Sequence, residues 1–189
     1  MTHARRILIA AATALAVLTA APASFASAGT RPDDGRATTH GGLDKVRDAT
    51  AAYHRLHRAV AAGWGTELAD LAGITCIADP DGTGGMGVHY VDVSRVDGSL
   101  DPLRPEALIY APDRSGGRHL VAVEYVVIRS GWEAAGHTAP PALFGRTFEL
   151  VPAGNRYGLP DFYELHAWIW RANPLGMFND WNPRVHCPA

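Results

Sequence analysis

The sequence lacks the short motifs that identify several large classes of enzyme. It contains no G-x-S-x-G, no H-E-x-x-H and no C-x-x-C segment, which are signatures of serine hydrolases, zinc metalloproteases and thioredoxin-like redox proteins. A G-x-G-x-x-G spelling occurs at 82–87, but a strand-like run follows it where dinucleotide binding requires a helix. No motif names a reaction, and whether the protein is an enzyme stays open on the sequence alone.

Lysine is almost absent, and the basic residues do not cluster. Lys45 is the one lysine, the arginines are scattered, and 17 basic residues stand against 19 acidic ones, for a net charge of −2. Proteins that bind nucleic acids or anionic membrane surfaces carry concentrated positive charge. We therefore expect no nucleic-acid partner, and no membrane partner once the N-terminal segment is removed. The pattern does not indicate an oligomeric state.

The N-terminal segment has the pattern of a cleavable signal peptide. Arg5 and Arg6 precede an apolar run over 7–23, and small residues follow as far as Ala28, as in export signals. A run of about 20 apolar residues can also anchor a protein in a membrane, but this one is mostly alanine and ends at small-x-small sites. We predict a signal peptide at 1–28 and a secreted, extracellular protein.

The remainder of the chain divides by composition into a leader and a domain. Residues 29–42 are rich in glycine, threonine and charge and have no apolar period, which is typical of flexible segments. Residues 43–189 are enough for one hydrophobic core. We predict a flexible leader at 29–42 and a single globular domain at 43–189.

Cysteine is scarce, with only Cys76 and Cys187 in the chain. An even number of cysteines in an exported protein favours a disulfide, and closing so long a loop is worth about 4–5 kcal/mol in the chain-entropy model. The alternative makes Cys187 a thiolate metal ligand beside His186. We predict the disulfide between Cys76 and Cys187.

Apolar spacing predicts one long helix followed by a β-rich region. Val46, Tyr53 and Val60 belong to a helical stripe over 43–62, and Gly63 supplies a stop signal. Five strand-like runs follow, at 86–93, 107–111, 119–129, 148–151 and 163–171. A turn-rich segment predicts a hairpin between the second and third runs. We expect an α+β fold: an antiparallel sheet of about five strands with one long N-terminal helix packed on it and long Pro/Gly-rich loops.

Three of the strand-like runs each carry one residue that does not suit a dry core. His89 lies in MGVHYVDV, Glu124 in LVAVEYVVI and His166 in FYELHAWIW. A buried carboxylate costs several kcal/mol unless it is paired, protonated or bound to a cation. If these strands are neighbours, two imidazoles and one carboxylate surround a divalent transition metal such as zinc, iron or copper, with positions open for water or a substrate.

Residues near these three predict the walls of a pocket. Alternate residues of a strand share a face, so Glu164 and Trp168 lie on the face of His166. Tyr90 and Tyr163 are candidates to supply a hydroxyl group. We expect these four side chains around the metal or a small-molecule ligand, and no catalytic residue is assigned.

A second interpretation needs no metal. Glu124 can instead pair with a buried arginine such as Arg104 or Arg171, while His89 and His166 satisfy backbone groups. The protein is then a non-catalytic ligand-binding or structural protein, and the aromatic residues concentrated in the last third of the chain line a groove. The sequence leaves both interpretations open.

Four segments together carry a resemblance to other proteins. They are GMGVHY at 85–90, LDPLRPE at 100–106, VEY at 123–125 and YELHAWIW at 163–170. The chain resembles a family of exported bacterial proteins with no known activity, over most of its length after the signal segment. The resemblance implies one secreted domain and assigns no catalytic residue.

Overall fold

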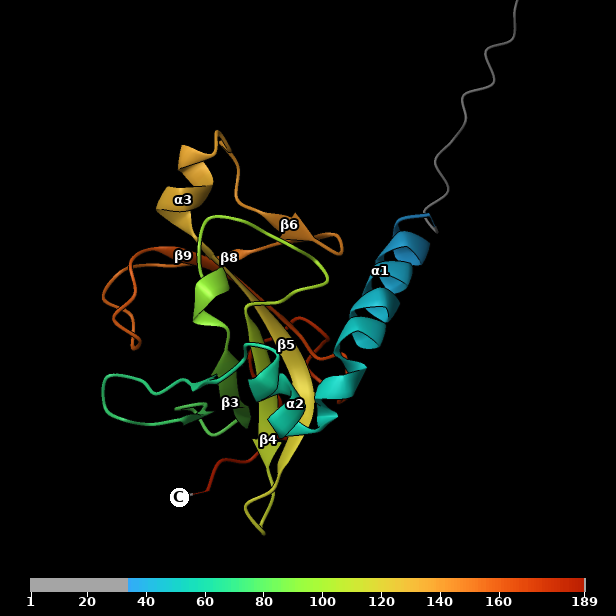
Figure 1. Cartoon of the computed structure of the whole chain (residues 1–189), viewed down its shortest axis with the longest axis vertical. Coiled ribbons are helices and arrows are strands. Elements are labelled where there is room, and N and C mark those ends of the chain that lie inside the picture. The colour runs from blue at the N-terminus through green and yellow to red at the C-terminus, as the bar shows by residue number, and fades with distance from the viewer. Residues whose placement is uncertain (1–33, 189) are drawn as a thin grey trace, which may run out of the picture. The chain divides into compact units, whose positions relative to one another are not determined.

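The middle of the sheet is β5 (Arg118–Ile128), the yellow strand of Figure 1. The computed structural model describes residues 34–188, with side chains described for 41–188. The signal peptide predicted at 1–28 lies outside the described residues. β5 is an almost unbroken run of buried residues because it is covered on both faces, which explains why its sequence is apolar without alternation.

The main sheet is antiparallel, as predicted, but it has seven strands in the described part of the chain. Their order is β1–β3–β4–β5–β9–β8, and β2 also pairs with β3. All five strand-like runs form strands, and the short β1 and β2 are additional. The strands besides β5 are β1 (Thr66–Glu67), β2 (Cys76–Ala78), β3 (Gly85–Val91), β4 (Ala107–Pro112), β8 (Glu149–Val151) and β9 (Phe162–Ala167).

The hairpin predicted between β4 and β5 is confirmed. The Asp113 carboxylate accepts hydrogen bonds from the backbone N–H groups of Ser115 and Gly117, both at 2.8 Å. An aspartate that binds the backbone two residues on is a common turn device. Smaller elements flank the sheet: η2 (Val93–Arg95), α3 (Arg129–Ala134) and a second hairpin of β6 (Ala142–Leu143) with β7 (Arg146–Thr147).

The single long helix predicted at 43–62 is wrong, because the chain forms three shorter pieces there. Arg55 has an extended backbone (φ −95°, ψ 103°) and interrupts the helical path. Just before it, the Tyr110 hydroxyl donates a hydrogen bond to the carbonyl oxygen of Tyr53 (2.7 Å), which a continuous helix would use itself. The pieces are α1 (Asp34–Thr50), the 3₁₀ turn η1 (Ala51–His54) and α2 (Leu56–Ala61).

The helical region begins earlier than predicted, but it ends near Gly63 as predicted. α1 begins at Asp34, inside the segment 29–42 for which we expected no regular structure, so the helix starts earlier than predicted. α2 ends at Ala61, and Gly63 has a φ of +119°, a conformation that glycine adopts without strain. The stop at Gly63 is therefore confirmed.

One face of the sheet packs against the helices. Leu43, Val46 and Ala59 from the helical region join Tyr110 and Tyr125 from the sheet in one buried core. Figure 1 shows α2 in front of β4 and β5.

A β-bulge at Val121 adjusts which β5 residues face this core. Tyr110 of β4 pairs with Leu120, whereas Ile109 pairs with Ala122, so Val121 is the extra residue. Leu120 consequently faces the helices, although strict alternation would put it on the same face as Ala122.

The opposite face of the sheet is covered by the C-terminal segment. Val185 packs against Ile109 and Trp168 in a second buried cluster. The backbones of Asn182 and Gly85 exchange two hydrogen bonds, of 3.1 and 3.3 Å. This segment closes over part of the sheet face that carries the candidate site.

The predicted disulfide is present. Cys76 on β2 is bonded to Cys187, with 111 residues of sequence separation, so Cys187 is not a thiolate ligand. The bond fastens the C-terminal segment to the edge of the sheet and indicates an oxidising environment. Among the described helices, none is both long and apolar enough to cross a membrane.

Candidate metal centre

Strand register brings Glu124 and His166 side by side. They are direct cross-strand partners on the adjacent strands β5 and β9. Their sequence neighbours Tyr125 and Leu165 belong to the core under the helices, so Glu124 and His166 point to the opposite face. Direct partners in an antiparallel pair have Cβ atoms about 4.5–5.5 Å apart, which places the two side chains in contact range.

His89 joins them from β3, across the intervening strand β4. Its partner on β4 is Ile109, and the partner of Glu124 on β4 is Ala107, so His89 and Glu124 lie diagonally across that strand. Strands are about 4.8 Å apart, and the two side chains therefore have to reach over β4. Ala107 is fully buried and small enough to leave the space between them free.

The three side chains converge on one volume. Nε2 of His89 is 3.4 Å from Oε2 of Glu124, and Nε2 of His166 is 3.9 Å from Oε1. One ligand atom from each residue lies within 4.8 Å of the other two. The exposed fractions are 2% for His89, 7% for Glu124 and 0% for His166. These residues can therefore hold a metal ion.

Several buried ring nitrogens in this cluster have no hydrogen-bond partner. They are Nδ1 of His89 and both Nδ1 and Nε2 of His166. Buried polar atoms are nearly always satisfied in native proteins, and an unsatisfied one signals a bound water, an ion or a functional role. The cluster is thus incomplete without a further group.

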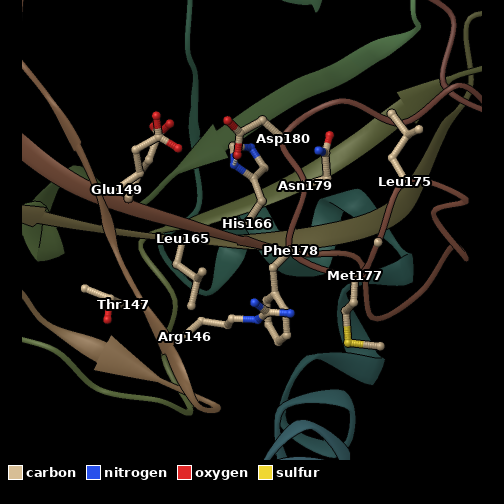
Figure 2. A pocket seen from close by; sticks show the side chains of 12 residues that line it. Arg146, Thr147, Glu149, Leu165, His166, Leu175, Met177, Phe178, Asn179 and Asp180 are labelled. Carbon is tan, nitrogen blue, oxygen red and sulfur yellow. Dashed lines mark ion pairs between the residues drawn. The ribbon is translucent and has the colours of Figure 1, made fainter.

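A second carboxylate approaches His166 from the loop that follows β9. Oδ1 of Asp180 is 3.3 Å from Nδ1 of His166, although the pair does not have the alignment of a hydrogen bond. Figure 2 shows the two side chains next to each other. Glu164, on the same strand face as His166, completes a second group whose ligand atoms lie within 4.8 Å of one another. These three residues, with Arg146 and Glu149, line a polar cavity of about 330 Å³.

Burial and the carboxylates act in opposite directions on the two imidazoles. Burial lowers the pKa of His89 to about 4, despite the opposing influence of Glu124. Burial also lowers the pKa of His166, but Glu124, Asp180 and Glu164 outweigh it and raise that pKa to about 9. His89 is therefore neutral at pH 7, whereas the negative charges around His166 favour the protonated, positively charged form of its imidazole.

Glu164 responds to the same surroundings. Burial first, and the nearby charge of Glu124 second, raise the pKa of Glu164 well above its usual range. Several carboxyl groups thus share a small volume in which a cation lowers their mutual repulsion.

A second cavity, of about 300 Å³, reaches Glu124 from another direction. Its walls are mostly aliphatic and include Val91 and Val126. Tyr157, from the loop between β8 and β9, also lines it, and burial together with the charge of Glu124 raises the pKa of the Tyr157 phenol. Glu124 therefore lines the apolar cavity, whereas His166 lines the polar one.

The predicted pocket residues divide between the two faces of the sheet. Glu164 and Trp168 lie on the side of His166, and the Trp168 ring stacks near the His166 ring with centroids 6.5 Å apart. Tyr90 and Tyr163 instead belong to the core under the helices. Their assignment to the pocket is wrong. Successive side chains of a strand point to opposite faces of the sheet, and Tyr90 is one residue from His89 while Tyr163 is three residues from His166.

The arginine pairing of the second interpretation is not found at Glu124. Arg104 is exposed, and Nη1 of Arg171 donates a hydrogen bond to the carbonyl oxygen of Arg184 (2.9 Å). The ion-pair contacts of Glu124 within the described residues are those with His89 and His166.

Asp180 is a site residue that the sequence did not reveal, whereas Tyr157 is one of the aromatic residues expected to line a groove, without an indication that it lies near Glu124. Both lie in irregular loops, where no hydropathy period indicates which way a side chain points. The run 179–181, an Asn-Asp-Trp between proline-containing segments, looks like any surface turn. Only the covering of the sheet face by these loops brings the two residues to the cluster.

Comparison with known proteins gives no family model, no curated protein and no solved structure that matches this chain. The function is therefore argued from the geometry of the site.

Proposed function

We propose that this protein binds one divalent transition-metal ion at His89, Glu124 and His166, and that the ion keeps coordination positions open for a small molecule. The observation that carries the proposal is the convergence of two imidazoles and one carboxylate, all buried, with Nε2 of His166 directed at Glu124 and without a hydrogen-bond partner. Two histidines and one carboxylate are a common ligand set for zinc, iron and copper.

The distances support an ion better than a direct ion pair. In a tetrahedral zinc site with bonds of about 2.0–2.2 Å, neighbouring ligand atoms lie about 3.3–3.6 Å apart. The distance from Nε2 of His89 to Oε2 of Glu124, 3.4 Å, lies in this range, and the distance from Nε2 of His166 to the other oxygen, Oε1, is slightly longer at 3.9 Å. A charge-assisted hydrogen bond between an imidazolium and a carboxylate is shorter, at about 2.7–2.9 Å.

Asp180 supports the same proposal from the other side of the His166 ring. Histidines that bind metals usually direct their second ring nitrogen to a carboxylate or carbonyl, which fixes the orientation of the ring. Nε2 of His166 faces Glu124 and Nδ1 faces Asp180 at 3.3 Å. Asp180 is thus a positioning residue for a metal-ligating His166.

The bound ion would polarise a coordinated oxygen or lower the pKa of a coordinated water. The residues themselves hold the ion, exclude bulk water by burial, and present it next to the two cavities. Secretion, predicted from the segment 1–28, stays a prediction that the disulfide makes reasonable.

Elemental analysis of the exported protein tests the proposal. We expect one zinc, iron or copper ion per chain in the wild type, and loss of that ion in Glu124→Gln and in His166→Ala. A matched control is His119→Ala, because His119 is an exposed histidine of the same strand β5 that contacts Asp113. This variant should keep the metal, and circular dichroism should show that all three variants fold.

Metal uptake after chelation provides an independent readout. Zinc at about 100 times its dissociation constant should raise the free energy of unfolding by about 2.7 kcal/mol. A wild-type protein that carries no metal and gains no stability from zinc, iron or copper ions would support the metal-free interpretation and overturn the proposal.

A further inference from the structure

The apolar cavity beside Glu124 has the composition of a ligand site rather than a packing defect. Its volume is about 300 Å³, and Val91, Val93, Val126 and Leu159 contribute to its walls. Among the described residues that line it, Glu124 is the one carboxylate. Small-molecule sites combine mostly apolar walls with a few polar groups that fix the orientation of the ligand.

The loop that covers this cavity is held in place by specific interactions. Arg156 forms an ion pair with Asp70, whose carboxylate lies 2.7 Å from Nη2. The backbone N–H of Leu71 also donates to the carbonyl oxygen of Arg156 (2.9 Å). These bonds keep Tyr157, the next residue, over the cavity. The cavity is therefore bounded by an ordered loop on one side and the sheet on the other.

Hydrogen bonds of the Asn155 side chain also hold the loop internally. Oδ1 of Asn155 accepts hydrogen bonds from the backbone N–H groups of Tyr157 and Leu159, both at 3.2 Å. Its amide nitrogen donates to the carbonyl oxygens of Pro152 and Leu159. These four hydrogen bonds fix the backbone of the loop that carries Tyr157 and Leu159 to the cavity.

From the apolar lining and the single carboxylate of Glu124 we infer that the cavity binds a small, mainly apolar molecule. One polar head group of this molecule coordinates the metal ion at Glu124. The inference rests on the proposed metal site. An apolar cavity of about 150 Å³ is enough for benzene, so a volume of about 300 Å³ admits a molecule of roughly two rings. The polar cavity at His166 and Asp180 offers ions and water a separate approach.

Two nitrogen ligands that differ by one apolar ring test the inference. Protein loaded with Co²⁺ is titrated with imidazole and with 4-phenylimidazole, and binding is followed by the visible absorption of the cobalt ion. We expect 4-phenylimidazole to bind at least about tenfold more tightly, because its phenyl ring leaves water for the cavity. Imidazole measures access to the metal alone.

Filling the cavity should remove the preference and leave the metal in place. In Val126→Trp, Co²⁺ content and imidazole affinity should match the wild type, while the advantage of 4-phenylimidazole falls to about twofold or less. Leu159→Trp, from the covering loop, provides a second filling variant if Val126→Trp does not fold. Val60→Trp adds the same bulk on the exposed side of α2 and should keep the tenfold preference.

The outcomes separate this inference from the proposed function. If Co²⁺ binds in stoichiometric amount but both probes bind equally to the wild type, the cavity is not the ligand site and the metal proposal stands. If the filling variants lose both probes together, the apolar cavity is not selective and the inference is again wrong. If no Co²⁺ binds at all, the inference fails together with the metal site on which it rests.

Discussion

His89 and Glu124 lie within 3.4 Å of each other although a complete strand, β4, separates their own strands. The contact is possible because the β4 residue directly opposite Glu124 is Ala107, whose methyl group does not fill the space above the strand. The convergence of the three candidate ligands therefore depends on Ala107, which has no ligand atom and no ionisable group in its side chain.

Enlarging Ala107 should break the cluster. In Ala107→Leu, the added side chain occupies the gap between His89 and Glu124, so we expect metal affinity to fall at least about tenfold and the free energy of unfolding to fall by about 1–3 kcal/mol. Competition with a chromophoric chelator measures the affinity. Ala107→Ser, which adds one atom, should stay within about threefold of the wild type. Equal affinities in Ala107→Leu and the wild type would show that the metal does not bind between these residues.

Removing the charge of Asp180 should weaken the metal site without removing a ligand. Asp180→Asn takes away the carboxylate 3.3 Å from Nδ1 of His166, and loss of such a partner typically lowers metal affinity about 10–100-fold. Chelator competition again gives the affinity, and the melting temperature of the metal-free protein reports the fold. The control is Asp44→Asn, an exposed aspartate of α1 paired with Arg47. An unchanged affinity in Asp180→Asn would contradict the positioning role.

Glu106 should make the protein less stable as the pH rises. Burial raises the pKa of this carboxyl group from 4.5 to about 8, against a hydrogen bond from the backbone N–H of Val126 and with smaller contributions from Asp97 and Glu124. The folded protein keeps a proton that the unfolded chain releases above about pH 4.5. The stabilisation is therefore complete below that pH and is lost as the pH approaches 8.

Urea denaturation between about pH 5 and pH 8 measures this effect. We expect the free energy of unfolding of the wild type to fall with pH relative to Glu106→Gln, by up to about 1.4 kcal/mol per pH unit. Glu133→Gln, at an exposed position of α3, should behave like the wild type. Parallel curves for Glu106→Gln and the wild type would show that Glu106 is ionised in the folded protein.

Reduction of the disulfide should destabilise the protein and loosen the C-terminal segment. Cys76 and Cys187 close a loop of 111 residues, for which the chain-entropy model gives about 4–5 kcal/mol. Urea denaturation of a Cys76→Ser, Cys187→Ser double variant should show most of this loss, and amide exchange should accelerate at Val185 first. A double variant as stable as the wild type would mean that packing alone holds the segment.

Local pattern was enough to predict the strands but not the continuity of the helix. Five strand-like runs were found because β-type residues between turn residues indicate a strand without further context. The stripe through Val46 and Val60 predicted one helix, yet Val60 is 45% exposed. The break at Arg55 accompanies the hydrogen bond from Tyr110 to Tyr53, a contact between segments far apart in the sequence.

The sequence predicts only those site residues that are ionisable and lie within an otherwise apolar strand. His89, Glu124 and His166 were visible because each is ionisable within an apolar run. Tyr90 and Tyr163 are close to His89 and His166 in the sequence, but the alternation of side chains along a strand places both on the opposite face, in the core under the helices. Asp180 reaches the site from a loop whose path depends on Val185, Asn182 and the disulfide, which no local pattern encodes.

Anomalous diffraction from crystals of the metal-loaded protein locates the ion itself. At the absorption edge of the bound metal, we expect one peak within about 2.0–2.2 Å of a nitrogen of His89, a nitrogen of His166 and an oxygen of Glu124. The absence of any peak there, with Glu124 hydrogen-bonded directly to an imidazole, would contradict metal binding at these three residues.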